Sequence, residues 1–383
     1  MFDALRFSAR LGAELGRTGL ERVTSREGTI PRTLDRVDVS WVERQLSERF
    51  PEVRIAGLRT LSEDRGTTAR RRLAIDYAPG GSPDSAPRTV FVKVRPPRLA
   101  EQIFGRMFRL GTTEVAFYRD VRPGLTVRAP TCYAAEAATG GEFALILEDL
   151  ARDGVALPTI ADPITRIQSE AVVDALAKLH AGFWGAARFP WLRTGRDNPN
   201  AAVERFVCAR AHGPTVRRFA HLLPDRVREG AHRIQRERRA LERYWADAPS
   251  TLIHGDSHAG NLYFEDGEAG FFDWQVTQRH QGIRDVAYFL ILSLDTRLRR
   301  EHERALVDRY RARLVDLGVP ASDVRAEDSW ERYRSFSLYA YIATSVTTAM
   351  SDLQPSHIAE LGLRRAATAV DDLDALRLLE RIG

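Results

Sequence analysis

The segment His254–Trp274, HGDSHAGNLYFEDGEAGFFDW, is the most informative part of the chain, because it places histidines, an asparagine and several carboxylates around one predicted β-hairpin. Asp266 and Gly267 stand between two apolar runs, and an Asp-Gly pair is a strong signal for a tight hairpin turn. If the hairpin is symmetric about Gly267, Asn261 lies opposite Asp273, with Cβ atoms about 4.5–5.5 Å apart. An amide oxygen and a carboxylate at that spacing suit a hard cation such as Mg²⁺.

Asp256 lies in the loop that enters this hairpin and adds a third oxygen-bearing group near the same place. His254 and His258 are four residues apart, a spacing that on a helix would favour zinc. The glycines around them and the strand that follows argue against a helix, so we expect His254 to orient the loop by hydrogen bonding.

The bulk composition indicates an ordinary globular protein. The chain has 383 residues, which is enough for two domains, with 44% hydrophobic and 28% charged residues. No apolar run approaches the roughly 18–20 residues of a membrane span. The arginine-punctuated N-terminus lacks the features of a secretory signal. Cys132 and Cys208 are far apart and predict neither a disulfide nor a cysteine metal site, so the cytoplasm is the expected compartment.

The charge pattern argues against nucleic acid as a partner, because the net charge of +5 comes from basic residues interleaved with acidic ones. Almost every basic residue is arginine, and lysine occurs only at Lys93 and Lys178. Lysine is a compact point charge, whereas arginine is a broad planar fork. A lysine at Lys93 therefore suggests a site that arginine would not serve, while Lys178 fits the polar side of a predicted helix.

The pattern of apolar residues predicts an α+β chain with a sheet-rich N-terminal part and a large helical C-terminal part. We expect an N-terminal arm or helix over residues 1–37, a first domain over 38–149 and a second over 150–383. The predicted strands are 53–61, 72–77, 89–94, 131–135 and 143–150, the first three as an antiparallel meander. The predicted helices are 38–50, 99–118 with a break near 111, 169–185, 214–246, 283–294, 301–317, 330–350 and 357–379. Within the helical part, the segment quoted above is the only strand–turn–strand pattern that we identify.

The pattern His-Gly-Asp, four residues, Asn and then a hairpin ending in Asp resembles the catalytic loop and metal aspartate of the aminoglycoside phosphotransferase and choline kinase-like superfamily. HGDSHAGN, FFDWQ, LILEDL and GIRDVAYFL are most similar to its ecdysteroid-kinase-like branch and the bacterial phosphotransferase enzyme family. The resemblance covers about residues 53–294. It implies a bilobal protein-kinase-like fold, with a small antiparallel-sheet lobe that binds nucleotide and a large helical lobe.

The resemblance also implies roles for individual residues in an ATP- and Mg²⁺-dependent phosphotransferase. Asp256 resembles the catalytic base, and Asn261 and Asp273 resemble the Mg²⁺ ligands. Lys93 resembles the cation that holds the α- and β-phosphates, a set sufficient for a reaction that needs positioning and charge neutralisation. Glu114 is similar to the helix glutamate that pairs with this lysine.

Further residues of the same resemblance concern the nucleotide and the loop. The segment Gly66–Thr68 (Gly66, Thr67 and Thr68) occupies the place of the phosphate-covering loop, although a single glycine stands there. Glu148 ends the strand that runs into the segment whose backbone receives adenine. Asp285 resembles an aspartate that supports the catalytic loop, and Glu101 remains a rival to Glu114.

The expected activity is transfer of the γ-phosphoryl group of ATP to a hydroxyl of a small molecule. The alternatives are a protein-substrate kinase, for which the H-R-D, D-F-G and A-P-E motifs are missing, and a catalytically silent nucleotide-binding protein of the same fold. The basic segments 193–206 and 210–219 favour a neutral or anionic acceptor, such as a sterol-like alcohol, a sugar or an acyl-bearing metabolite, over an aminoglycoside. Neither the acceptor nor the oligomeric state follows from the sequence.

Overall fold

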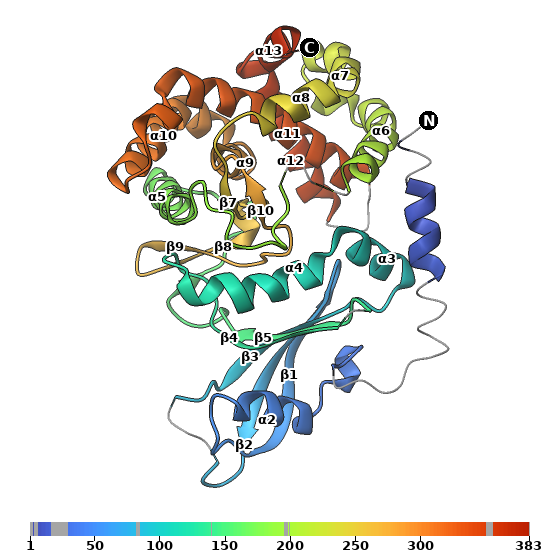
Figure 1. The fold of residues 1–383 in the computed structure, drawn as a ribbon, viewed down its shortest axis with the longest axis vertical. Coiled ribbons are helices and arrows are strands. Elements are labelled where there is room, and N and C mark those ends of the chain that lie inside the picture. Colours follow the sequence, from blue (N-terminus) through green and yellow to red (C-terminus); the bar gives the residue numbers. More distant parts are fainter. Residues whose placement is uncertain are drawn as a thin grey trace. The chain divides into compact units, whose positions relative to one another are not determined.

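The computed structural model describes residues 3, 7–16, 30–81, 85–138, 140–194, 198, 200–349 and 355–382. The chain forms two compact units (Figure 1). The sheet unit comprises Leu5–Gly124 and Ala129–Asp153, and the helical unit comprises Met1–Ala4, Leu125–Arg128 and Gly154–Gly383. Of the predicted N-terminal arm, residues 7–16 are helical, and residues 17–29 lie outside the described residues.

The sheet unit is built on a five-stranded antiparallel sheet with the strand order β1-β2-β3-β5-β4. Its elements are η1 (Leu34–Arg36), α2 (Val39–Ser47), β1 (Ile55–Arg65), β2 (Ala69–Tyr77), β3 (Thr89–Val94), α3 (Leu99–Phe108), α4 (Leu110–Ala116), η2 (Phe117–Val121), η3 (Arg122–Gly124), β4 (Cys132–Ala137) and β5 (Phe143–Glu148). The expected meander of the first three strands is confirmed, and β5 rather than β4 pairs with β3.

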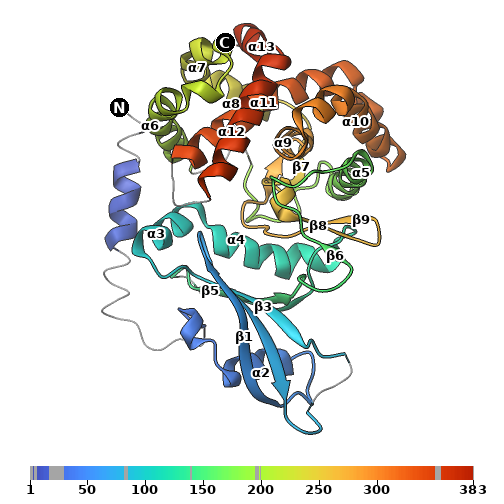
Figure 2. The ribbon, with the colours of Figure 1, turned by 180° about the vertical axis from the view of Figure 1, so that it is seen from behind.

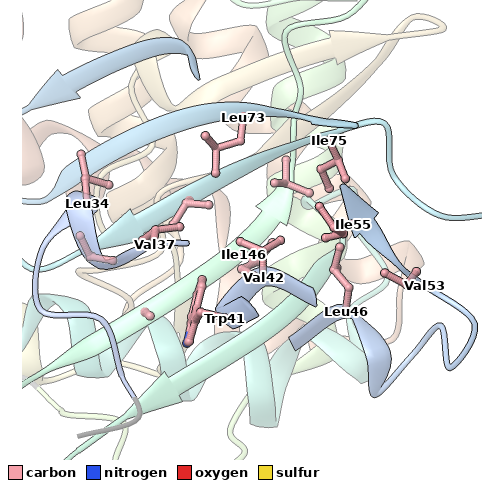
Figure 3. Close-up of a cluster of buried hydrophobic side chains, with 14 of the residues drawn as sticks. Leu34, Val37, Trp41, Val42, Leu46, Val53, Ile55, Leu73, Ile75 and Ile146 are labelled. Carbon is pink, nitrogen blue, oxygen red and sulfur yellow. The ribbon is translucent and has the colours of Figure 1, made fainter. Parts of the chain in front are cut away.

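Helix α2 covers one face of this sheet. It begins at Asp38, whose carboxylate accepts a hydrogen bond from Trp41 N at 2.8 Å. Trp41, Val42 and Leu46 then pack with alternate residues of the strands, as Figure 3 shows. Because successive strand residues point to opposite faces, a β3 strand that buries Val90, Val92 and Val94 against α2 must direct the side chain of residue 93 to the other face.

Helix α4 packs on the other face of the sheet, against β4 and β5. The break between α3 and α4 falls at Arg109, which has the left-handed φ of 58°. Gly111 follows in the first turn of α4, where an added Cβ would stand 2.1 Å from the Phe143 ring of β5. Glycine at this position therefore lets α4 approach the sheet closely.

The helical unit is mainly α-helical, as expected, but it contains more strands than the sequence predicts. Its elements are β6 (Val155–Ala156), α5 (Arg166–Gly182), α6 (Ala201–Arg218), η4 (Ala220–Leu222), α7 (Asp225–Arg236), α8 (Arg238–Ala246), β7 (Thr251–Ile253), η5 (Ala259–Asn261), β8 (Leu262–Glu265), β9 (Glu268–Phe271), β10 (Gln278–His280), α9 (Ile283–Ser293), α10 (Thr296–Asp316), η6 (Ala321–Val324), α11 (Ala326–Ala349), α12 (Ser356–Asp372) and α13 (Ala375–Ile382). The hairpin β8–β9 is present, and β6 extends it to three strands. Strands β7 and β10 pair separately. The prediction of a lone hairpin was wrong because strands of two or three residues carry almost no alternation.

Helix α9 lies at the centre of the helical unit, with α5, α10, α11 and α12 packed around it (Figure 2). Each of its residues is buried, as its nearly continuous apolar sequence requires. Its first turn carries the one acidic residue of the helix, Asp285. None of the helices in the described part of the chain is long and apolar enough to cross a membrane.

Candidate active site

The predicted functional residues divide between the two units. Lys93, Glu114, the Gly66–Thr68 turn and Glu148 belong to the sheet unit, and Asp256, Asn261 and Asp273 belong to the helical unit. Each set is described within its own unit.

The loop that carries Asp256 begins directly after β7 with a conformation that only glycine adopts readily. Gly255 has a φ of 89°, and an added Cβ would stand 2.5 Å from the carbonyl oxygen of Val276. At its other end the loop is held by α9, where Ser257 Oγ donates to Asp285 O at 2.8 Å. Backbone conformation and side-chain bonds thus hold the loop from both ends.

The carboxylate of Asp285 is the main anchor of this loop. It is fully buried and accepts hydrogen bonds from His254 N at 2.6 Å and from Gly255 N at 3.0 Å. His180 Nε2 of α5 lies 3.3 Å from the same carboxylate, and Tyr310 Oη lies 2.8 Å from His180 Nδ1. Burial alone would raise the pKa of Asp285, but the bond from His180 and the donors of the loop hold that pKa below its ordinary value. Asp285 is therefore an ionised acceptor that holds the loop backbone.

The imidazole of His254 connects the loop to the hairpin. Asp256 N donates to His254 Nδ1 at 3.2 Å, so Nδ1 is the acceptor, and Nε2 must carry the hydrogen that it donates to Phe272 O at 2.9 Å. Burial lowers the pKa of His254 from its ordinary value, despite the opposing charges of Asp285 and Asp256. The neutral ring thus joins the backbone at Asp256 to the residue before Asp273, which is the orienting role expected for it. With both nitrogens engaged, His254 has no lone pair for zinc.

The side chains of Asp256 and Asn261 are in direct contact. Asn261 Nδ2 donates to Asp256 O at 2.8 Å and to Asp256 Oδ2 at 2.9 Å. Both bonds use the amide nitrogen, so the amide oxygen of Asn261 is the atom available as a cation ligand. The Asp256 side chain is 36% exposed, whereas the Asn261 residue is 7% exposed. The base candidate is thus accessible while its neighbour is held within the fold.

The register of the hairpin differs from the expected one. Leu262 pairs with Phe271, so Asn261 stands opposite Phe272, whose N donates to Asn261 O at 3.1 Å, and not opposite Asp273. The physical reason is the turn: Asp266 and Gly267 both have positive φ, of 53° and 79°, as a two-residue type I′ turn requires. Its centre lies between these two residues and not on the glycine.

Asp273 follows the hairpin in a left-handed conformation, with φ of 66°. This is uncommon for a residue other than glycine, and aspartate tolerates it better than most. Its Oδ1 accepts a hydrogen bond from Gln275 Nε2. The conformation turns the chain out of the strand direction directly after Phe272.

In the sheet unit, Lys93 and Glu114 form a buried ion pair. Lys93 Nζ lies 2.8 Å from Glu114 Oε1 and 2.7 Å from Oε2, and the side chains are 3% and 0% exposed. The rival Glu101 instead lies 3.4 Å from Arg98 on the surface of α3. Between the two glutamates, the structure therefore selects Glu114, which the close packing of α4 on β5 brings to the strand.

The remaining predicted residues of the sheet unit lie at two places. Gly66, Thr67 and Thr68 form the tight connection between β1 and β2, in which Gly66 N donates to Thr68 O at 3.0 Å. Glu148 closes β5, where its Oε2 accepts a hydrogen bond from Thr131 N at 3.0 Å. The side chain of Glu148 therefore links the end of β5 to the residue before β4. The backbone after Glu148, and not its side chain, is then the candidate for contacting the adenine base.

Two residues near the loop have no counterpart in the sequence analysis. Tyr288 of α9 is buried, and burial followed by the charge of Asp256 raises its pKa well above the ordinary value. His180 bonds to a residue 105 positions away, and no sequence spacing predicts such a contact. Tyr288 had a weak signal, because it lies one helical turn after Asp285 and so shares its side of α9.

The described residues hold no cluster of three or more histidine, cysteine, aspartate or glutamate side chains suited to a metal ion. The donor set expected here is different, an amide oxygen from Asn261 and a carboxylate from Asp273. Such hard oxygen ligands fit Mg²⁺, which binds through few protein groups and completes its shell with water and phosphate.

The sheet unit, with helices packed on its antiparallel strands, and the mainly helical unit together define an α+β fold. The profile of the phosphotransferase enzyme family matches residues 82–321, more than half of the chain. The chain belongs to this family and is a phosphotransferase.

Among solved structures, the chain is similar to a choline kinase from Streptococcus pneumoniae (11% identity over 87% of this chain and 99% of that chain, TM-score 0.46). It is also similar to a macrolide 2′-phosphotransferase from Brachybacterium faecium (15%, 83% and 98%, TM-score 0.44) and an ethanolamine kinase from Plasmodium vivax (11%, 85% and 84%, TM-score 0.49). These distant similarities do not identify a substrate. No curated protein matches the sequence significantly.

Proposed function

We propose that the protein transfers the γ-phosphoryl group of ATP, with Mg²⁺, to a hydroxyl group of a small molecule. The observation that carries this proposal is the loop in which Asp256 is exposed and Asn261 is bonded to it. Asp256 accepts the proton of the acceptor hydroxyl as the oxygen attacks phosphorus. Proton transfer to such a positioned group contributes typically 10²–10⁴-fold to the rate.

Asn261 and Asp273 are the groups that would hold Mg²⁺, which when bound neutralises charge on the phosphates. Neutral His254 and ionised Asp285 position the loop and do not react. Lys93, oriented by its ion pair with Glu114, would bind the α- and β-phosphates, and the backbone of Gly66–Thr68 would cover them. The backbone after Glu148 is the proposed contact for adenine.

The charges around Asp256 favour a neutral or anionic acceptor over a cationic one. Arg284 of α9 is buried, and its guanidinium carbon stands 3.9 Å from the ring centroid of Tyr339. Asp256 and Arg284 act in opposite directions on the pKa of Tyr288, so both charges act on this buried tyrosine. A buried cation beside the tyrosine disfavours a cationic group at the same place. Neutral and anionic alcohols are therefore the acceptors to test beside choline and an aminoglycoside.

The test is ADP release from Mg²⁺-ATP across these alcohols, for the natural protein, Asp256→Asn and Asp266→Asn. Asp266 is the matched control, because it lies in the same hairpin with an 87% exposed side chain. We expect Asp256→Asn to lower kcat at least about 100-fold and Asp266→Asn to leave it unchanged. Equal activity in both variants would remove Asp256 as the base.

A thermal-shift measurement separates nucleotide binding from chemistry. Mg²⁺-ATP should raise the Tm of the natural protein and of Asp256→Asn, but raise that of Asp273→Asn much less. Stabilisation of all three proteins without turnover of any acceptor would instead favour a catalytically silent nucleotide-binding protein.

A further inference from the structure

Arg284 of α9 is a buried arginine that has no carboxylate partner among the described residues. The described part of the chain buries three arginines, Arg238, Arg284 and Arg299. Arg238 Nε donates to Glu242 Oε1 at 2.9 Å, and Arg299 Nη1 donates to Glu303 Oε2 at 2.7 Å. Arg284 is 6% exposed, yet within the same residues it forms no ion pair. The fold therefore compensates two of these three buried charges and leaves that of Arg284 without a counter-ion.

The side chains that surround Arg284 are neutral. Its Cζ stands 3.9 Å from the ring centroid of Tyr339, and its Nη2 donates a hydrogen bond to Tyr339 Oη. Tyr288 follows one helical turn later on the same side of α9. Burial raises the pKa of both tyrosines, so neither phenol carries a charge. Burial, followed by the charge of Arg284, lowers the pKa of His280 to about 3, so this imidazole is neutral as well.

Part of the guanidinium group also lacks a hydrogen-bond acceptor. Arg284 Nε is buried and has no hydrogen-bond partner in the described part of the chain. Burying a charge without a counter-ion is costly, and buried charges in proteins are normally paired. The planar guanidinium fork matches an oxyanion through two parallel hydrogen bonds. Because stacking on Tyr339 already fixes its plane, the group has little side-chain freedom left to lose when an anion binds.

The uncompensated arginine is a neighbour of the proposed catalytic loop. Burial, the charge of Asp256 and a hydrogen bond to its side chain raise the pKa of Tyr288, whereas the charge of Arg284 lowers it. The phenol of Tyr288 thus interacts with both the carboxylate and the guanidinium. His258 Nε2 lies 3.6 Å from Asp256 Oδ2, and its ring centroid lies 6.3 Å from that of Tyr288. A proton acceptor and an uncompensated cation therefore lie near each other within the helical unit.

We propose that the acceptor alcohol carries an oxyanion, either a carboxylate or a phosphate group, and that Arg284 binds this oxyanion while the hydroxyl lies at Asp256. This inference rests on the proposed function, because it names the substrate class of the same site. The hydroxyl oxygen forms its bond to the γ-phosphorus as the bond between that phosphorus and ADP breaks, and the hydroxyl proton goes to Asp256. Arg284 is then a specificity residue, because it contacts the substrate away from the reacting atoms. A neutral acceptor would leave its charge unpaired, and a cationic one would be repelled.

The first test uses the natural protein and pairs of compounds that differ in charge. The pairs are hydroxy acids of increasing chain length with their primary amides, and sugar phosphates with the parent sugars. Calorimetric titration without nucleotide measures binding, and ADP release from Mg²⁺-ATP measures turnover. At least one anionic compound should bind about tenfold or more tightly than its neutral counterpart, the value of one charge-assisted hydrogen bond. The two kinds of pair distinguish a carboxylate from a phosphate, and the absence of any preference for an anion would overturn the proposal.

The second test changes Arg284 itself. Arg284→Gln removes the charge and should weaken binding of the preferred anion about tenfold or more, with no effect on the neutral counterpart. Arg332→Gln is the matched control, because Arg332 of α11 also stacks at 3.9 Å on a tyrosine ring, that of Tyr244. Arg332 Nη2 donates to Asp247 O at 2.9 Å, and its removal should leave anion binding unchanged. Equal effects of the two substitutions on anion binding would show that Arg284 does not bind the oxyanion.

The two readouts separate this inference from the proposed function. Asp256→Asn should bind the preferred anion at least as tightly as the natural protein, because it removes a negative charge, but should release ADP far more slowly. Binding that depends on Arg284 without ADP release in the natural protein would support the oxyanion site and contradict phosphoryl transfer. ADP release that is equal for anionic and neutral alcohols, and unchanged in Arg284→Gln, would support phosphoryl transfer and contradict the role of Arg284.

Discussion

The contribution of the buried pair Lys93–Glu114 to the free energy of unfolding can be measured separately from its contribution to activity. Its side chains are 3% and 0% exposed, and both carboxylate oxygens lie within 2.8 Å of the ammonium nitrogen. Removing one partner leaves the other charge buried without its counter-ion, which costs about 3–5 kcal/mol. We therefore expect Lys93→Met and Glu114→Leu each to lower the free energy of unfolding by about that amount.

The double variant Lys93→Met/Glu114→Leu removes both charges and keeps side chains of similar volume. Replacing a buried ion pair by apolar residues is often neutral or stabilising by about 1–4 kcal/mol, so the double variant should be more stable than either single one. It should nevertheless release no ADP, because the proposed cation for the α- and β-phosphates is gone.

The assays are urea unfolding of the four proteins in a double-mutant cycle and ADP release with the best acceptor. Arg98→Met serves as a control, because its pair with Glu101 is exposed and should contribute less than about 1 kcal/mol. If the loss of unfolding free energy in the double variant equalled the sum of the losses in the two single variants, Lys93 and Glu114 would not stabilise each other as an ion pair. If the double variant kept full activity, the role proposed for Lys93 would be wrong.

Three further predictions concern the loop and its surroundings. Asp285→Asn should lower the free energy of unfolding by about 1.5–3 kcal/mol, because one charge-assisted hydrogen bond to the loop is lost. An unchanged midpoint in urea titration would contradict the anchoring role of Asp285. Gly255→Ala should cost more than Gly267→Ala by the same measurement, since both add strain at positive φ but only the former brings a Cβ within 2.5 Å of a carbonyl oxygen. Burial, followed by the charge of Arg284, lowers the pKa of His280 to about 3. Below pH ~6.5 the imidazole is therefore protonated in the unfolded chain but neutral in the folded one, so the free energy of unfolding should fall by up to about 1.4 kcal/mol per pH unit as the pH drops towards 3. His280→Asn should flatten this pH dependence, which urea titrations at pH 7.5 and 5.5 would measure.

Much of the fold follows from local patterns in the sequence. The β3 strand was predicted at its observed bounds because an alternating β-branched run has one low-energy conformation against a core. The break before α4 was expected near Gly111 and occurs two residues earlier, at Arg109. The Asp266–Gly267 turn is equally local, since its dihedral angles depend on those two residues alone.

The functional residues also divide into features that local sequence specifies and features that packing decides. The sequence by itself determined the order of chemical groups along the chain, a lysine on a strand and Asp, Asn and Asp around a hairpin, because spacing and turn preferences are properties of neighbouring residues. Only the tertiary structure decided that Glu114 rather than Glu101 meets Lys93 and that His180 supports Asp285. Ion pairs and hydrogen bonds between residues 21 to 105 positions apart depend on how helices pack against strands. That packing is set by the volumes and directions of many side chains at once, which no short segment specifies.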